Sequence, residues 1–125
     1  MRNQRSTAIA IGLAALALVV LFSSSPVAGE DDAATLEPGR EAFVANKCNM
    51  CHSVESLKIE RTSKSEKMQA RDLSTVGDDH DAEWIVGFAR KEMQLDGEDH
   101  KRSYKGTDEE LQHIGAWLAS LKSAE

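Results

Sequence analysis

The spacing of apolar and polar positions predicts helices at three places along the chain. We expect one helix over residues 38–47, a second over 81–91 and a third that follows Thr107. In the first, Pro38 stands at the first helical position, where its missing N–H leaves no bond unmade. The apolar anchors of the three helices are Phe43 and Val44, then Trp84, Ile85 and Phe88, then Leu111, Ile114, Leu118 and Leu121.

The third helix carries the clearest local signals. Thr107 and Glu110 form a capping box, in which the Thr107 hydroxyl accepts from the backbone N–H of Glu110 and the Glu110 carboxylate reaches back. Gly115 lies in the middle of this helix, where glycine costs about 1 kcal/mol relative to alanine. A glycine at this position indicates that another helix approaches closely.

The other segments are polar and show no sustained period. We expect loops over 53–70 and 92–106, and a disordered acidic segment over 30–37. No part of the sequence shows the alternation that is typical of strands. The pattern therefore predicts an all-α fold of three main helices joined by loops.

The amino terminus has the pattern of a secretory signal peptide. An uncharged apolar run over residues 8–22 follows Arg2 and Arg5, and small residues come after it. The run is shorter than the roughly 20 residues of a spanning helix. We therefore predict a signal peptide over 1–29 and one domain over 30–125; the alternative is an uncleaved membrane anchor.

Charge and cysteine content narrow the function classes. The chain has 15 basic and 21 acidic residues, a net charge of −6, and loss of residues 1–29 makes it −8. This balance argues against a nucleic-acid-binding protein. The two cysteines are three positions apart, so a disulfide between them would close almost no loop. A short exported chain with a thin core then needs another source of stability, and a buried cofactor is the natural one.

The sequence Cys48-Asn49-Met50-Cys51-His52 is a C-x-x-C-H motif, the attachment motif for haem c. Its two thiols form thioethers with the porphyrin vinyl groups, and the adjoining His52 binds the iron. Two alternatives are disfavoured. A thioredoxin-type dithiol needs a βαβ context, and a zinc site needs four ligands, commonly from two such pairs.

The chain resembles the class I-like monohaem cytochromes c over about residues 38–122. Phe43 before the motif is similar to that family's amino-terminal helix, and Trp117 to the aromatic residue of its last helix. The resemblance implies that Trp117 packs on the first helix at a glycine, and Gly39 and Gly115 fit such a crossing. It also implies that the carbonyl of Arg71, which stands in place of a proline, accepts from His52. The fold implied is three helices wrapped around one covalent haem.

In this family the distal iron ligand is usually a methionine in the loop before the last helix. Laying the family spacing on this chain, seventeen residues before Trp117, gives His100. We predict His100 as the distal ligand, with Met93 as its rival and an open or water-bound iron as the remaining alternative. A His52/His100 pair favours a low potential, because methionine raises the potential of haem.

The predicted function is a periplasmic one-electron carrier that cycles Fe(III)/Fe(II) without acting as an enzyme. Its partners would be redox proteins, and Lys47, Lys101, Arg102 and Lys105 form either a basic collar for acidic partners or an ordinary mixed-charge surface. The alternative function is a haem c protein with a displaceable distal ligand that binds small gases or peroxide. A third is a carrier tethered to a membrane enzyme through residues 1–29.

Overall fold

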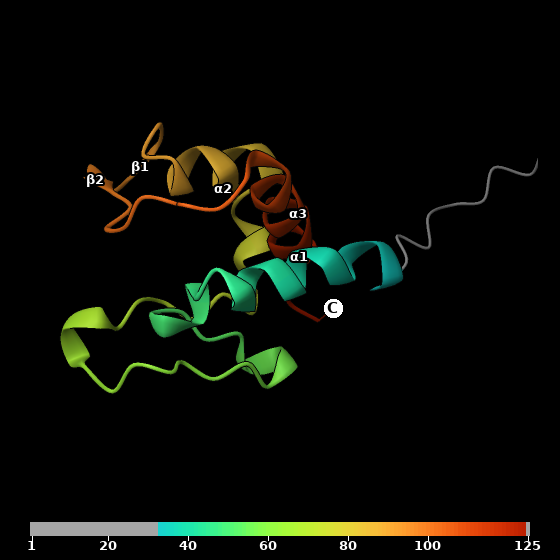
Figure 1. Ribbon diagram of the computed structural model, residues 1–125, viewed down its shortest axis with the longest axis horizontal. Coiled ribbons are helices and arrows are strands. Elements are labelled where there is room, and N and C mark those ends of the chain that lie inside the picture. The colour runs from blue at the N-terminus through green and yellow to red at the C-terminus, as the bar shows by residue number, and fades with distance from the viewer. Residues whose placement is uncertain (1–32, 125) are drawn as a thin grey trace, which may run out of the picture.

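The computed structural model describes residues 33–124 and is built from three α-helices, four 3-10 turns and one small hairpin (Figure 1). The α-helices are α1 (Ala33–Ala45), α2 (Ala82–Ala89) and α3 (Asp108–Ala119). The 3-10 turns are η1 (Cys48–Met50), η2 (Glu55–Leu57), η3 (Glu66–Met68) and η4 (Val76–Asp78). The hairpin strands are β1 (Gln94–Leu95) and β2 (Glu98–Asp99). The expected helical fold is confirmed.

Helix α1 differs from the prediction at both ends. It begins at Ala33, so its first turns cover part of the segment expected to be disordered, and Pro38 lies inside the helix. The early turns form because Leu36 packs against the core, although Pro38 leaves the carbonyl four residues before it without a helical partner. The helix ends before residue 47 because Lys47 adopts a left-handed conformation with φ 59°.

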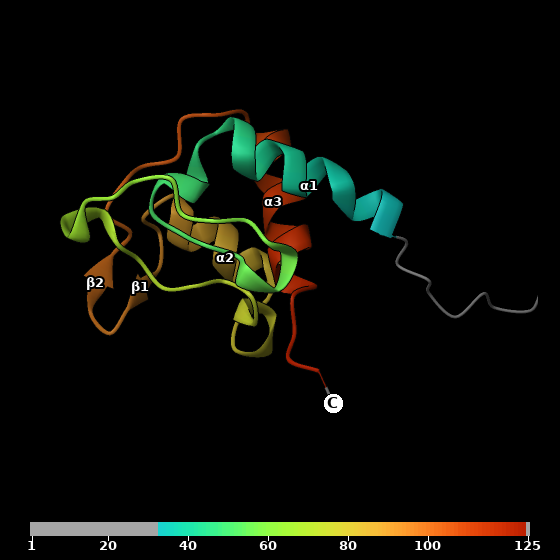
Figure 2. The same cartoon turned by 90° about the horizontal axis from the view of Figure 1, so that it is seen from below.

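The crossing of α1 and α3 forms the centre of the core, and both views show the two helices in contact (Figures 1 and 2). At Gly39 an added Cβ would meet the His113 carbonyl and lie 2.5 Å from the Cβ of Trp117. Phe43 is 1% exposed, and its ring centroid lies 5.2 Å from that of Trp117. The packing that the resemblance implied for Gly39, Phe43 and Trp117 is confirmed.

Gly115 has a different neighbour from the one expected. An added Cβ would lie 2.7 Å from Cγ2 of Val86 and 3.0 Å from the Ala82 carbonyl oxygen. Gly115 therefore allows close approach of α2, whereas the crossing of α1 and α3 depends on Gly39. Helix α2 is shorter than the predicted 81–91. It begins after Asp81, whose side chain accepts from the backbone N–H of Trp84, and it ends at Ala89. The capping box of α3 is present as expected.

The expectation that the chain lacks strands is wrong within 92–106. Strands β1 and β2 pair antiparallel, with Gln94 opposite Asp99, and the Gln94 amide donates to the Asp99 carboxylate at 2.9 Å. The two turn residues, Asp96 and Gly97, have φ 53° and 80°. Positive φ at both central positions is typical of the tight turns that match strand twist, and Asp-Gly favours such turns.

The predicted loop over 53–70 folds back on the segment around Cys51. Val54 and Ile59 pair through hydrogen bonds of 2.8 and 3.1 Å and are buried. At the far side of the loop, Thr62 N–H donates to the Asn49 carbonyl at 2.8 Å. These contacts hold an otherwise irregular segment against η1.

Within residues 33–124, no helix has the length and apolar character needed to cross a membrane. The predicted signal peptide, with the anchor as its alternative, lies outside the described residues.

Candidate haem site

The motif cysteines lie directly after α1, on the turn that Lys47 starts. The N–H groups of Cys51 and His52 both donate to the Cys48 carbonyl, at 3.3 and 3.1 Å. This turn holds the three motif residues together, and both cysteines are free and half-buried. Burial raises the pKa of the Cys48 thiol to about 11, so this thiol is protonated at neutral pH in the apo chain.

His52 is held from one side by the segment that returns from the loop. Its Nδ1 lies 2.8 Å from the Arg71 carbonyl oxygen, as the resemblance implied. On either side of Arg71, Ala70 N–H donates to Cys51 and Leu73 N–H to Ser53. A protonated Nδ1 that donates to a carbonyl leaves Nε2 as the nitrogen with a free lone pair. Burial lowers the pKa of His52, which favours the neutral, metal-binding form.

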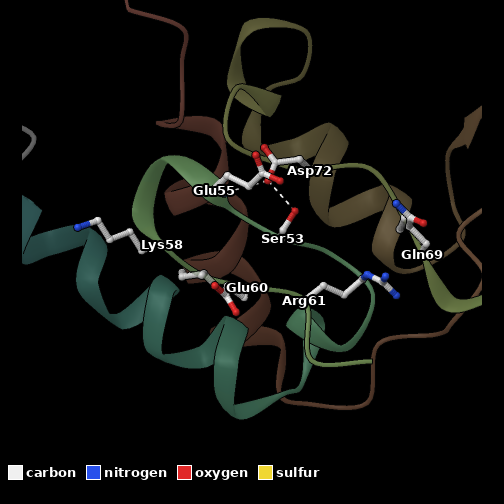
Figure 3. Close-up of a pocket in the computed structure, with 9 residues that line it drawn as sticks. Ser53, Glu55, Lys58, Glu60, Arg61, Gln69 and Asp72 are labelled. Carbon is white, nitrogen blue, oxygen red and sulfur yellow. Dashed lines mark hydrogen bonds between the residues drawn. The ribbon is translucent and has the colours of Figure 1, made fainter. Parts of the chain in front are cut away.

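Asp72 supports this returning segment (Figure 3). Its carboxylate accepts from the Ser53 hydroxyl at 2.7 Å and from the N–H groups of Glu55 and Ser74, each at 2.9 Å. Partial burial raises the pKa of Asp72, but the hydrogen bonds from Ser74, Ser53 and Glu55 outweigh it and hold that pKa at about 2. Asp72 is therefore ionised at neutral pH. Its carboxylate connects the segment that follows Arg71 to Ser53, the residue after His52.

His100 follows β2 and lies opposite His52. The ring centroids are 6.1 Å apart and the ring planes are within 10° of parallel. The Nδ1 of His100 lies 2.5 Å from the Arg102 carbonyl oxygen, so in this ring too Nε2 is the free nitrogen. The structure thus brings together the four residues predicted from the sequence to bind haem: Cys48, Cys51, His52 and His100.

A row of aromatic rings leads from His100 along α2. Phe88 meets the His100 ring edge-on at 5.2 Å, Trp84 stacks on Phe88 at 5.0 Å, and His80 stacks on Trp84 at 3.6 Å. The spacing of these side chains was apparent in the sequence, but their contact with His100 was not, because it depends on how the hairpin folds back against α2.

The rival ligand, Met93, lies at the foot of β1. Its side chain is 40% exposed and packs against α2, with Cγ 2.9 Å from where a Cβ of Gly87 would lie. In this structure the side chain that lies opposite His52 is that of His100 and not that of Met93.

A polar pocket of about 690 Å³ lies inside the loop that precedes Leu73 (Figure 3). Its lining residues are Ser53, Glu55, Lys58, Ile59, Glu60, Arg61, Gln69, Ala70 and Asp72. Neither motif cysteine nor His52 lines it, whereas Ser53 and Asp72, which support the segment that holds His52, do.

The donor set fits haem c. Two thiols at the required spacing adjoin a histidine, and the imidazoles of His52 and His100 lie 6.1 Å apart, each with its Nδ1 within hydrogen-bond distance of a backbone carbonyl. Hydrogen bonds of this kind orient histidine ligands and raise their basicity.

Comparison with known proteins gives a family. The family model described as Cytochrome c matches residues 36–122, which include the motif and all three helices from Leu36 onward. No curated protein and no solved structure matched the chain. Members of this family generally carry electrons. With its C-x-x-C-H motif inside the matched range, the chain belongs to the cytochrome c family and binds haem c covalently.

Proposed function

We propose that this protein is a periplasmic one-electron carrier whose haem iron is bound by His52 and His100. The observation that carries the proposal is the 6.1 Å separation of two nearly parallel imidazole rings. A metal–imidazole bond is about 2.0 Å long, and the bonding nitrogen lies a little over an ångström from its ring centre. Two imidazoles on one metal would therefore have ring centres about 6 Å apart. The 6.1 Å between the ring centres of His52 and His100 therefore matches the spacing that one iron bound to both Nε2 atoms would need.

The protein's contribution is to hold both rings in this arrangement. The carbonyls of Arg71 and Arg102 fix each histidine with Nε2 as the free nitrogen. Haem c supplies the Fe(III)/Fe(II) couple. Because two strong ligands leave no position for a substrate, the arrangement favours electron transfer over catalysis. Imidazole in place of methionine also lowers the potential.

The location and the partners rest on the sequence and on the surface charge. Arg2 and Arg5 before an apolar run support export to the periplasm, with an uncleaved anchor as the alternative. Lys101 and Arg102 are exposed directly after His100, and Lys47 is exposed directly before Cys48. On a chain that is otherwise acidic, this local positive charge supports docking of acidic redox proteins.

The proposed ligation is tested by optical and electron paramagnetic resonance spectra of the matured ferric protein. We expect a low-spin spectrum without the near-infrared sulfur-to-iron band of methionine ligation. His100→Ala removes the bis-imidazole signature, whereas His113→Ala, an exposed histidine on α3, preserves it.

Two results contradict the proposal in different ways. A sulfur-to-iron band in the wild-type ferric protein assigns a methionine to the distal side. A high-spin wild-type spectrum with ready uptake of carbon monoxide by the ferrous form supports the gas- or peroxide-binding alternative instead.

A further inference from the structure

The hairpin that positions His100 also positions a methionine beside it. In its register, Gln94 lies opposite Asp99 and Leu95 opposite Glu98. Extending this register by one residue places Met93 opposite His100. Residues directly opposite each other in an antiparallel pair project to the same face, with Cα atoms about 4.5–5.5 Å apart. On this register Met93 and His100 belong to the same face of the hairpin, one residue beyond the last pair that the strands form.

Contacts with α2 support this placement independently. The Met93 side chain packs at Gly87, and the next residue of α2, Phe88, meets the ring of His100 at 5.2 Å. Both side chains of the hairpin thus lie against the same end of α2. A bond between the side chains of Gln94 and Asp99 fixes the adjoining pair and with it the register.

The side chain of Met93 is partly exposed. It is 40% exposed, one of three large apolar side chains that are exposed among the described residues. Methionine is unbranched and has three rotatable bonds, so its thioether adapts to several positions. Its sulfur is a neutral, soft donor of the kind that binds haem iron and raises its potential.

We propose that Met93 is a second distal ligand, which binds the haem iron when the imidazole of His100 leaves it. This exchange rests on the proposed His52/His100 ligation. It breaks one Fe–N bond and forms one Fe–S bond, and no electron or proton is transferred. Because a thioether is a softer donor than imidazole, the exchange favours the ferrous state. The hairpin therefore carries two ligands for the same position, which set different potentials.

The test uses the matured holoprotein of three variants. Ferric His100→Ala is expected to be low-spin and to gain the near-infrared sulfur-to-iron band. His100→Ala/Met93→Leu is expected to lose that band, to become high-spin and to show a lower reduction potential than His100→Ala. The matched control is His100→Ala/Met68→Leu, which keeps the band because Met68 is held elsewhere, with its Sδ 3.5 Å from the Ser63 hydroxyl.

A second experiment serves if the His100→Ala protein does not incorporate haem. His100→Gly is produced in buffer with imidazole, which occupies the position of the missing ring, and the imidazole is then removed by dialysis. Growth of the sulfur band as imidazole leaves supports the proposal. A high-spin spectrum in either arm, equal to that of the Met93→Leu double variant, overturns it. That result leaves the bis-imidazole proposal intact, which fails only if the wild-type ferric protein lacks the bis-imidazole signature.

Discussion

Asp72 shows how one side chain stabilises the proximal part of the site. Its carboxylate accepts hydrogen bonds from residues on both sides of the contact between His52 and Arg71. An acceptor with several donors costs more to remove than one exposed ion pair, because the donors lose their partner together.

We predict that Asp72→Asn lowers the free energy of unfolding by about 1–3 kcal/mol, measured by denaturant titration. It also changes the pH dependence. The folded-state pKa of Asp72 is about 2, below its ordinary value of 3.8, so its contribution is complete above about pH 4 and is lost as pH falls toward 2. Asp72→Asn therefore removes that part of the acid sensitivity. Glu98→Gln, at an exposed strand position, serves as the control; an unchanged acid profile for Asp72→Asn contradicts the assigned role.

At the scale of elements, the crossing of α1 and α3 depends on the absence of one side chain. Gly39 lies against the backbone of His113 and the Cβ of Trp117. Neither atom belongs to the flexible end of a side chain, so the two helices must move apart to accommodate a methyl group.

We predict that Gly39→Ala lowers the free energy of unfolding by about 1–3 kcal/mol in the holoprotein. The gain in helix propensity, which is about 1 kcal/mol, offsets only part of the clash. Thermal unfolding followed by circular dichroism measures the effect. Glu41→Ala, an exposed position on the same helix, is expected to change little. Equal stability of Gly39→Ala and the wild type would show that the crossing tolerates the extra group.

The elements that could be predicted are those whose signals are local. The capping box at Thr107 predicted the start of α3, and the C-x-x-C-H spacing identified the cofactor. The start of α1 was missed because it depends on tertiary packing of Leu36. The hairpin was missed although Asp96-Gly97 is a local signal, because each of its strands is only two residues long and shows no alternation.

At the scale of the whole molecule, the site joins segments from across the chain. The Arg71 carbonyl could be expected only through the family resemblance, because backbone acceptors leave no trace in side-chain patterns. The role of His100 also depended on the resemblance, because a single histidine in a polar loop carries no local signal of its own. The contact between Phe88 and His100 depends on the fold of the entire loop between α2 and α3. Both histidines thus reach the site from irregular segments, His52 beside the 53–70 loop and His100 after the hairpin.

This arrangement predicts that haem attachment and folding are coupled. The protein core consists of a few buried side chains, chiefly around Phe43, Leu111 and Trp117, whereas the segments that carry His52 and His100 are mostly half-buried or exposed. A group that binds the folded state and not the unfolded state adds to stability, and a chain of this size has little stability to spare.

We therefore predict that Cys48→Ser/Cys51→Ser, which removes covalent attachment, gives a chain with a lower melting temperature and less helix than the holoprotein. Far-ultraviolet circular dichroism and thermal unfolding measure both effects. The control is Lys64→Ala, at an exposed position of the 53–70 loop, which keeps both thiols and is expected to mature normally. Hydrogen exchange locates the effect: amides of 53–72 and 90–106 lose protection first, while those at the crossing of α1 and α3 retain the most. If the double variant melted at the same temperature as the holoprotein, the protein core alone would be sufficient and haem would not contribute to folding.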